Sequence, residues 1–313
     1  MKRIGSRIDI CICTFRRPGL AATLKSVAAQ RLPRGVSIRV IVSDNDDLPS
    51  AKALVEECAG WLDLPIQYLH SPARNISIAR NACLDAVSGD YFAFIDDDET
   101  ATGNWLSALV AKARQSGADV VLGPVRARYD EHAPDWLKAG NFHETRPVWV
   151  KGEIRTGYSC NVLVKVGAAS VIGRRFDLAR GKSGGEDTEF FDAVFAAGGR
   201  IEFAPEAWVE EPVPENRACF KWLARRRFRS GQTHGGLLRR KSASGVAKQL
   251  PIAFAKFVYS LGSVFAPPFH EVSAKRALLR AVLHAGAMTG LLGWRQPQIY
   301  GGPDLPSSET RYR

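Results

Sequence analysis

The sequence lacks an uninterrupted apolar run long enough for a conventional membrane-spanning helix. The longest uncharged stretches among its 313 residues, Phe257–Phe269 and Ala281–Trp294, have 13 and 14 residues, whereas a spanning helix needs about 20. The basic N-terminus is not followed by a long apolar stretch or a small-residue cleavage site, so we expect a cytoplasmic protein. Internal repeats and low-complexity segments are also absent. With 45% hydrophobic and 24% charged residues, the composition excludes disordered, collagen-like and coiled-coil chains.

Cysteine is scarce and scattered, and no CxxC pair is present. The six residues are Cys11, Cys13, Cys58, Cys83, Cys160 and Cys219. Cys11 and Cys13 would share one face of a strand, but no further cysteine or histidine lies nearby at the spacing of a metal site. We therefore interpret all six as reduced thiols, mostly buried.

Acidic residues are nearly missing from one long stretch. Residues 217–295 contain 15 Lys or Arg and a single acidic residue, whereas residues 1–216 have a net charge of −3. All the excess positive charge of the chain, +11 overall, therefore lies in that stretch. Clustered cations attract nucleic acid and anionic membranes alike, so the charge alone leaves both partners open.

The first 125 residues alternate strand-length apolar runs with helix-length segments. The runs are Ile8–Cys13, Ile38–Val42, Ile66–Leu69, Tyr91–Ile95 and Val120–Leu122. The segments between them are Pro18–Gln30, Ala51–Trp61, Ile76–Val87 and Trp105–Gln115. Repeated strand–helix–strand units favour an α/β fold, with a mostly parallel sheet wound with helices, because parallel strands need crossover connections.

The rest of the chain is less regular. We expect loops and one or two strands over 125–185, followed by a helix over Glu186–Ala197, short strands over Ile201–Phe203 and Ala207–Val209, and helices from Arg217 onward. This pattern predicts a domain over 1–216 with halves 1–124 and 125–216, a basic helical region over 217–295, and a loose tail over 296–313.

Polar residues follow three of the expected strands at the point where each strand ends. They are Thr14–Arg17, Ser43–Asp47 and Asp96–Glu99. Ligands bind at the carboxyl ends of strands in wound sheets, so we expect one shared crevice. The carboxylates of Asp96–Glu99 would repel one another unless a cation lay on them. Two interpretations stay open: a Mg²⁺ or Mn²⁺ site that also takes phosphate oxygens, and an acidic turn that caps the helix beginning near Gly103.

Six short segments stand out along residues 14–187. They are Thr14-Phe15-Arg16-Arg17-Pro18, Leu24–Gln30, Val42-Ser43-Asp44-Asn45-Asp46, Ile78-Ala79-Arg80-Asn81-Ala82, Asp96-Asp97-Asp98 and Gly185-Glu186-Asp187. In this order they resemble motifs of family 2 glycosyltransferases with the GT-A fold, including its D-x-D and G-E-D motifs. The likeness is greatest to bacterial chain-elongating members of the succinoglycan type.

The sequence departs from the family pattern in ways that bear on specificity. Cys13 and Arg16 stand where the first motif has Pro and Asn, and no second Asp directly follows Asp44. These departures leave the preference for base and sugar open. The Q-x-x-R-W motif of processive members is missing, which indicates addition of one sugar per encounter.

The resemblance implies a role for each matched residue. It assigns nucleotide binding to Thr14, Phe15, Arg16, Asp44, Arg80, Asp96 and Asp97. In this assignment Asp44 accepts a hydrogen bond from the nucleobase and Asp96 touches the ribose. Divalent metal binding, by Mg²⁺ or Mn²⁺, falls to Asp98, Asp96 and His234. For Arg80, a surface arginine without a role stays an alternative, and for His234 an exposed surface histidine.

Asp187 is the candidate general base, with Glu186 beside it as a second candidate catalytic residue. An acceptor hydroxyl must lose a proton as it attacks the anomeric carbon, and a carboxylate after the Gly184-Gly185 turn could take that proton. Direct displacement would invert the configuration. Two alternatives stay open, namely that Glu186 binds acceptor hydroxyls, or that both acids only complement the helix dipole.

Several aromatic side chains lie in the irregular middle segment. Trp136, Trp149 and Tyr158 could stack on acceptor sugar rings, or could simply form the small core of that segment.

The basic region combines its cations with apolar helices too short to span a bilayer. This combination is typical of helices that lie in the membrane interface. We expect contact with an anionic membrane surface at the cytoplasmic face, and no nucleic acid partner. The alternative is that the helices simply pack on the body of the protein.

Together these features predict an inverting, metal-dependent glycosyltransferase. By resemblance, it would move a sugar, with glucose as first guess, from a UDP-sugar to a polyprenyl-diphosphate-linked oligosaccharide in exopolysaccharide synthesis. Two alternatives are a sugar nucleotidyltransferase, disfavoured by the missing glycine-rich loop after Cys13, and a nucleic-acid-binding protein that uses Arg225–Arg229.

Overall fold

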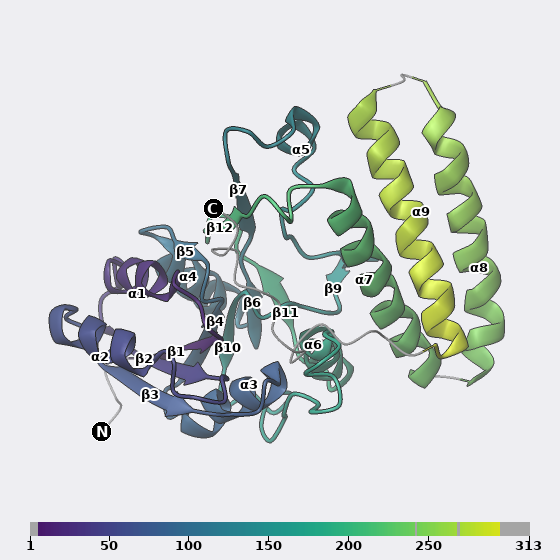
Figure 1. Cartoon of the computed structure of the whole chain (residues 1–313). Coiled ribbons are helices and arrows are strands. Elements are labelled where there is room, and N and C mark those ends of the chain that lie inside the picture. The colour runs from purple at the N-terminus through teal and green to yellow at the C-terminus, as the bar shows by residue number, and fades with distance from the viewer. Residues whose placement is uncertain (1–5, 242, 268–269, 295–313) are drawn as a thin grey trace.

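A seven-stranded sheet forms the centre of the computed structural model, which describes residues 6–241, 243–267 and 270–294 (Figure 1). The strand order is β11-β6-β10-β4-β1-β2-β3. The bounds are β1 (Ser6–Thr14), β2 (Val36–Asp44), β3 (Ile66–His70), β4 (Tyr91–Ile95), β6 (Val120–Leu122), β10 (Asn161–Lys165) and β11 (Ile201–Phe203). The tail expected over 296–313 lies outside the described residues.

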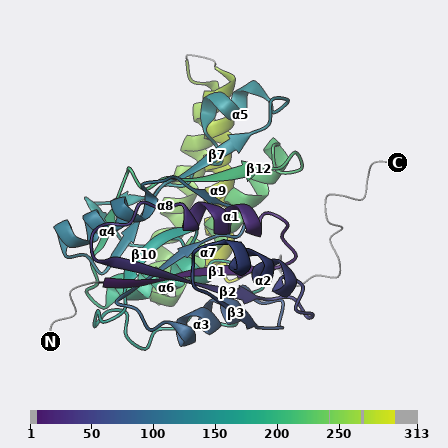
Figure 2. The same cartoon turned by 90° about the vertical axis from the view of Figure 1, so that its left-hand side faces the viewer.

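Helices cover both faces of this sheet. Their bounds are α1 (Leu20–Ala28), α2 (Lys52–Trp61), α3 (Ile76–Ala86), α4 (Trp105–Ser116) and α6 (Glu186–Ala196). One core cluster joins α1, α2 and α4 to one face, and a second joins α3 and α6 to the other. Figure 2 shows these two layers on opposite sides of the strands. Alternating side chains of β1 enter the two cores, with Ile10 in the first and Cys11 in the second.

The fold confirms the expected α/β class with a mostly parallel sheet, and it corrects the start of one strand. β10 runs antiparallel to both of its neighbours, β4 and β6, while the other pairs in the sheet are parallel. The strand expected over Ala207–Val209 begins only at Val209, because a tight turn holds the amide of Ala207 on the carbonyl of Ala204. This strand, β12 (Val209–Val213), pairs with β5 (Thr100–Ala101) and β7 (Val125–Tyr129) in a second small sheet.

The middle segment contains only short elements. They are α5 (Asp135–Gly140), β8 (Trp149–Val150) and β9 (Glu153–Ile154). The aromatic side chains there divide into packed ones and an exposed one. Trp136 packs against Phe142 and Phe220, and the buried Tyr158 hydroxyl donates to the Gly123 carbonyl at 2.6 Å, as expected for core residues. Trp149 is half-exposed and remains available to a ligand.

Three long helices follow the second sheet. They are α7 (Phe220–Lys241), α8 (Ala243–Gly262), which continues into the 3₁₀ turn η1 (Ser263–Phe265), and α9 (Glu271–Leu292). α9 lies between α7 and α8, so α8 is the outermost helix (Figure 1). Within the described residues, no helix has the length and apolar content needed to cross a bilayer.

Glycines allow α7 and α9 to approach closely. A Cβ on Gly235 would lie 2.1 Å from the Ala287 carbonyl oxygen, and one on Gly290 would lie 2.2 Å from that of Gln232. A Cβ on the neighbouring Gly236 would meet only a side-chain atom of Arg180, at 3.7 Å. The two adjacent helical glycines therefore differ sharply in the space around them.

This difference predicts opposite effects of the same substitution. Gly235→Ala forces the two helix backbones apart, and we expect it to lower the free energy of unfolding by about 1–3 kcal/mol. Gly236→Ala is the matched control, and we expect it to be neutral or to stabilise by up to about 1 kcal/mol, since alanine favours the helix. Urea denaturation of both variants measures the difference. Equal changes in the free energy of unfolding of the two variants would contradict the close contact of Gly235 with α9.

His143 ties the middle segment to the start of α7. Its Nδ1 accepts from the Tyr129 hydroxyl at 3.0 Å, and its Nε2 donates to the Arg217 carbonyl at 3.1 Å, with the tautomer set by these partners. The ring also stacks on Trp222. Burial lowers the pKa of His143 to about 4 and the nearby arginines add to the shift, although the Arg217 carbonyl opposes it.

The low pKa of His143 predicts a pH dependence of stability. Below the ordinary histidine pKa, His143 is protonated in the unfolded chain but stays neutral in the folded chain. The free energy of unfolding therefore falls as the pH drops toward 4. Between about pH 6.5 and pH 5 we expect wild type to lose about 2 kcal/mol relative to His143→Gln, which keeps both hydrogen bonds without titrating. Parallel urea titrations measure this, and parallel pH profiles would refute it.

Candidate active site

The ends of four strands meet at one edge of the main sheet. Thr14 at the end of β1 lies opposite Asp44 at the end of β2, and Ile95 at the end of β4 lies opposite Asn161. Because β10 is antiparallel, its first residue lies at the edge where the parallel strands finish. The strand ends therefore meet as expected, and Cys160, which directly precedes β10, lies near the acids after β4.

The acids after β4 form a tight cluster. Ligand atoms of Asp96, Glu99 and Cys160 all lie within 4.8 Å of one another, the one such group of three among the described residues. Glu99 is buried, and one of its oxygens accepts from the Asp96 amide at 3.0 Å. The acid run thus folds back on itself and brings two carboxylates and a thiol together.

Burial and mutual repulsion raise the pKa values of three carboxyl groups in this run. Desolvation raises the pKa of Asp96 to about 6, with Arg80 opposing the shift and Asp98 adding to it. Desolvation and Asp98 likewise raise the pKa of Asp97 to about 7. Burial raises the pKa of Glu99 well above its usual range. The cluster is thus short of positive charge, as expected of a site that takes up a cation.

Asp98 and Asp97 face an arginine from the end of β1. A guanidinium nitrogen of Arg17 lies 3.5 Å from an Asp98 oxygen, and another lies 3.8 Å from Asp97. Asp97 is buried, whereas Asp98 is partly open to solvent. Asp98 is therefore the more accessible of the two for a ligand.

Arg80 links the acids after β4 to the acids that open α6. Its buried guanidinium pairs with Glu186 and lies 4.0 Å from Asp96, above the ring of Phe176. Although burial alone would lower the pKa of Arg80, the charges of Glu186 and Asp96 raise it. The nucleotide contact of Arg80 stays a prediction, and the structure adds that its side chain lies between two protein carboxylates.

Only one carboxylate oxygen of Glu186 has a hydrogen-bond partner among the described residues. Oε1 is held by Arg80, while the buried Oε2 has no hydrogen-bond partner among the described residues. Burial raises the pKa of Glu186, and Arg80 opposes this shift. An oxygen in this state can accept a hydrogen bond from a ligand that enters the cleft.

The Gly184-Gly185 turn aims the start of α6 into the cleft. Both glycines have φ above 80°, a left-handed conformation that favours glycine, and a Cβ on Gly185 would collide with Thr233 of α7. Asp187, one residue into the helix, accepts from the Thr188 amide and adds its charge to the field at Asp96 and Arg80. Asp187 and the acid cluster therefore belong to one site.

Asp44 is engaged within its own turn. It is fully buried, and its oxygens accept from the Tyr68 hydroxyl and the Ala51 amide, both at 2.8 Å, and from the Asp46 amide. Three donors of the chain therefore already use the Asp44 carboxylate, and its contact with a nucleobase stays a prediction. The local reason is the Asp44–Asp47 turn, whose amides need an acceptor.

The predicted nucleotide residues at the end of β1 lie at the rim. Thr14 is buried beside Asp97, while Phe15 and Arg16 are partly exposed, with Arg16 pairing with Asp46 at 2.8 Å. Arg16 adopts a positive φ of 52°. The exposed ring and guanidinium are placed to line a ligand at this edge.

His234 does not join the acids. Residues 220–241 form one continuous helix, and His234 lies exposed on it, as in the alternative of a surface histidine. Partial desolvation and the cations Lys256 and Lys241 lower the pKa of His234, and it in turn influences His284. These groups belong to the helical bundle, so no contact in the described part of the chain supports its expected role as a metal ligand.

Three residues of the site escaped the sequence interpretation. Glu99 has no role of its own in the predictions from the sequence, where it is part of the run Asp96–Glu99, and Cys160 is interpreted there only as one of six reduced thiols. Glu211 of β12 is half-buried, its pKa is raised by burial, and it pairs with Arg217 at 3.4 Å. The Glu210-Glu211 pair beside an expected strand was the available signal for the third.

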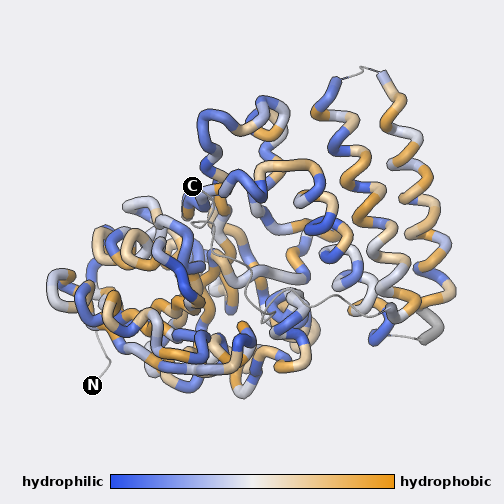
Figure 3. Tube along the Cα trace, in the orientation of Figure 1, coloured by the Kyte–Doolittle hydropathy of each residue, from blue (hydrophilic) through white to orange (hydrophobic). Residues whose placement is uncertain are grey.

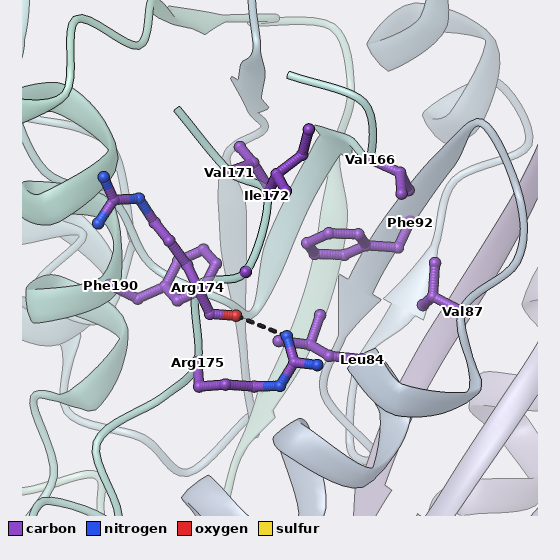
Figure 4. Close-up of a pocket in the computed structure, with 10 residues that line it drawn as sticks. Leu84, Val87, Phe92, Val166, Val171, Ile172, Arg174, Arg175 and Phe190 are labelled. Carbon is purple, nitrogen blue, oxygen red and sulfur yellow. Dashed lines mark hydrogen bonds between the residues drawn. The ribbon is translucent and has the colours of Figure 1, made fainter. Parts of the chain in front are cut away.

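A separate apolar pocket lies away from this site (Figure 4). It has a volume of about 170 Å³ and is lined by side chains such as Leu84, Val87, Phe92 and Phe190 from the α3–α6 side of the sheet. Arg174 and Arg175 close its edge. It contains no acidic side chain, so it does not share the chemistry of the strand-end cluster.

A family model described as "Glycosyl transferase family 2" matches residues 9–173. The chain belongs to glycosyl transferase family 2. The matched residues contain the ends of β1, β2 and β4, so the acid cluster lies inside the family's own domain. Family membership sets aside the sugar nucleotidyltransferase and the nucleic-acid-binding protein as alternatives.

Relatives within glycosyl transferase family 2 cover most of the chain. The succinoglycan biosynthesis protein ExoM of Rhizobium meliloti is 54% identical over 303 residues, 96% of this chain and 98% of that protein. A glucosyl-dolichyl phosphate glucuronosyltransferase of Haloferax volcanii is 24% identical over 246 residues, 72% of this chain and 75% of that protein.

Solved structures confirm the GT-A fold. The mannosyltransferase PcManGT of Pyrobaculum calidifontis, solved with GDP-Man and Mn²⁺, has a TM-score of 0.61 and 16% identity, covering 92% of this chain and 87% of that one. Residues 1–349 of TarS from S. aureus have a TM-score of 0.50 and 16% identity, with 92% of each chain covered.

Proposed function

We propose that this glycosyltransferase moves one sugar from a nucleotide-diphosphate donor to a lipid-linked oligosaccharide during exopolysaccharide synthesis of the succinoglycan type. The observation that carries the proposal is the chain of charges from Asp96 through the buried Arg80 to the buried Glu186, which joins the strand-end acids to the start of α6. The near full-length likeness to ExoM supports the pathway. UDP-glucose is the proposed donor, on the motif resemblance.

The residues present fit a divalent cation. Asp98 and Asp96, with Glu99 behind them, offer carboxylate oxygens, the ligands that Mg²⁺ and Mn²⁺ prefer. The raised pKa values of Asp96 and Glu99 indicate a site short of positive charge. The Cys160 thiol is a softer donor, so we assign it no contact with such an ion. When bound, the cation would offset charge on the departing diphosphate.

The remaining steps use the chain's own side chains. Asp187 would take the proton of the acceptor hydroxyl as the oxygen attacks the anomeric carbon from the side opposite the diphosphate, which inverts that carbon. The free Oε2 of Glu186 would accept a hydrogen bond from the acceptor sugar and hold the attacking hydroxyl in line. Phe15 and Arg16 would line the nucleotide at the rim of the cleft.

We further propose the parts of the chain that serve each task. Residues 1–216 form the catalytic domain, with 1–124 on the donor side and 125–216 on the acceptor side. Residues 217–295 hold the enzyme at the cytoplasmic face of the membrane, where a polyprenyl-diphosphate carrier presents its sugar. The concentration of cations in this region supports the arrangement.

A donor panel tests the proposal without the acceptor. We expect one nucleotide sugar, with Mg²⁺ or Mn²⁺, to raise the melting temperature and to be hydrolysed slowly, while the others do neither. Product anomers resolved by NMR then report inversion or retention. No stabilisation and no hydrolysis by any nucleotide sugar with either metal would overturn the proposed function.

A further inference from the structure

α8 has one face on the bundle and one face without a protein neighbour. Ala253 and Ser260 are buried, and Leu250 and Phe257 are half-buried, on the side that packs against α9. The opposite side faces away from the body of the protein (Figure 1). An ordinary surface helix would carry polar side chains there.

The outward side of α8 is instead apolar. Residues three and four apart along a helix share one face, and the exposed members of this set are Ala247, Pro251, Phe254, Val258, Leu261 and Phe265. We name this set the outer stripe. Phe265 is 75% exposed, and the neighbouring Tyr259 is 76% exposed. Figure 3 shows hydrophobic colours along most of the helix.

The charges around the outer stripe have one sign. Lys248 and Lys256 are exposed on α8, and neither has a carboxylate within salt-bridge distance among the described residues. Lys248 lies next to the outer stripe, whereas Lys256 lies on the far side of the helix from it and acts on His234 and His284. α8 has no acidic residue, and Glu271 is the only acid of the basic region. By contrast, Arg240 and Lys241 of α7 are already paired with Glu189 and Asp192 of α6.

We propose that the outer stripe is a lipid-binding surface that lies in the headgroup layer of an anionic bilayer. An apolar face with Lys248 beside it, on a helix that has no acidic residue, matches acyl chains next to anionic headgroups. A second copy of the chain fits less well, because it would bring the lysines of two copies toward each other. This inference rests on the proposed function, because a lipid-linked acceptor requires the enzyme to reach a membrane. It assigns the membrane contact to α8 rather than to the whole basic region.

The experiment is sedimentation of the full chain with vesicles of phosphatidylcholine, with and without phosphatidylglycerol. We expect binding to the anionic vesicles and little to the neutral ones. Phe254→Ser/Val258→Ser/Phe265→Ser should lower the partition coefficient about tenfold or more. A matched control, Val148→Ser/Ile172→Ser/Leu178→Ser, removes exposed apolar side chains elsewhere and should bind as wild type.

A charge variant separates the two contributions. Lys248→Glu/Lys256→Glu should weaken binding to anionic vesicles severalfold while leaving any residual binding to neutral vesicles unchanged. Equal loss in the outer-stripe variant and its control would overturn the proposal, as would absence of binding by wild type. An oligomer that the outer-stripe variant converts to monomers would show a self-association surface instead.

Donor hydrolysis in vesicle-free solution keeps the two proposals apart. The outer-stripe variant should hydrolyse donor at the wild-type rate, which also shows that it is folded. Vesicle binding without donor hydrolysis by wild type would contradict the proposed function alone, and hydrolysis without vesicle binding would contradict the membrane surface alone.

Discussion

Asp187→Asn should lower the rate of sugar transfer by about 10³-fold, within the range of a lost general base, while donor affinity stays near that of wild type. Asparagine has almost the same shape, and its side-chain oxygen can still accept from the Thr188 amide, so the start of α6 is preserved. It cannot take up the proton of the acceptor hydroxyl. Turnover with acceptor and calorimetric donor titration measure the two quantities separately.

The matched control for this variant lies on the same helix. Asp192 also belongs to α6, but its carboxylate pairs with Lys241 on the side facing α7. Asp192→Asn should therefore keep transfer near the wild-type rate. Substantial turnover in Asp187→Asn, or an equal loss in both variants, would remove Asp187 from the role of base.

Arg80→Gln should damage both stability and activity. It leaves the Glu186 carboxylate buried without its cation, which typically costs about 3–5 kcal/mol of unfolding free energy. It also frees Asp96 and the start of α6 from their common anchor, and we expect kcat to fall about 10²-fold from misplacement of the reacting groups. Urea denaturation and turnover measure the two losses.

A double variant distinguishes two roles of Arg80: positioning the site, and neutralising the buried Glu186 carboxylate. Arg80→Gln/Glu186→Gln replaces the ion pair by two neutral amides, so most of the stability should return. Activity should not return, because neither the anchor of Asp96 nor the Glu186 carboxylate is restored. Recovery of both quantities would mean that Arg80 only satisfies a buried charge and does not position the site.

The main sheet and its helices could be predicted because each signal is local. The runs around Ile10, Val40 and Ala93 are continuously apolar since both faces of the sheet are covered. The direction of β10 could not be predicted, because a short apolar run does not show which neighbour it pairs with. The continuity of α7 was also missed. Three glycines argue against a helix by propensity, and only packing against α9 explains Gly231 and Gly235.

The candidate site also contains parts that could be predicted from the sequence and parts that could not. The carboxylates after β4 could be predicted because acids directly behind a buried strand are unfavourable without a partner. The pair of Arg80 with Glu186 could not, since 106 residues separate them and no local pattern joins them. The burial of Asp44 could not be predicted for a related reason. Its carboxylate oxygen accepts hydrogen bonds from the Tyr68 hydroxyl and the Ala51 amide, and the positions of these two donors depend on the fold.

Calorimetric titration with UDP, in the presence and absence of Mn²⁺, tests most directly whether the strand-end acids share a cation with the donor diphosphate. The account predicts that UDP binds wild type only with the metal, and that Asp96→Asn/Asp98→Asn abolishes this binding while the protein stays folded. UDP binding of equal strength without metal, or in the double variant, would contradict it.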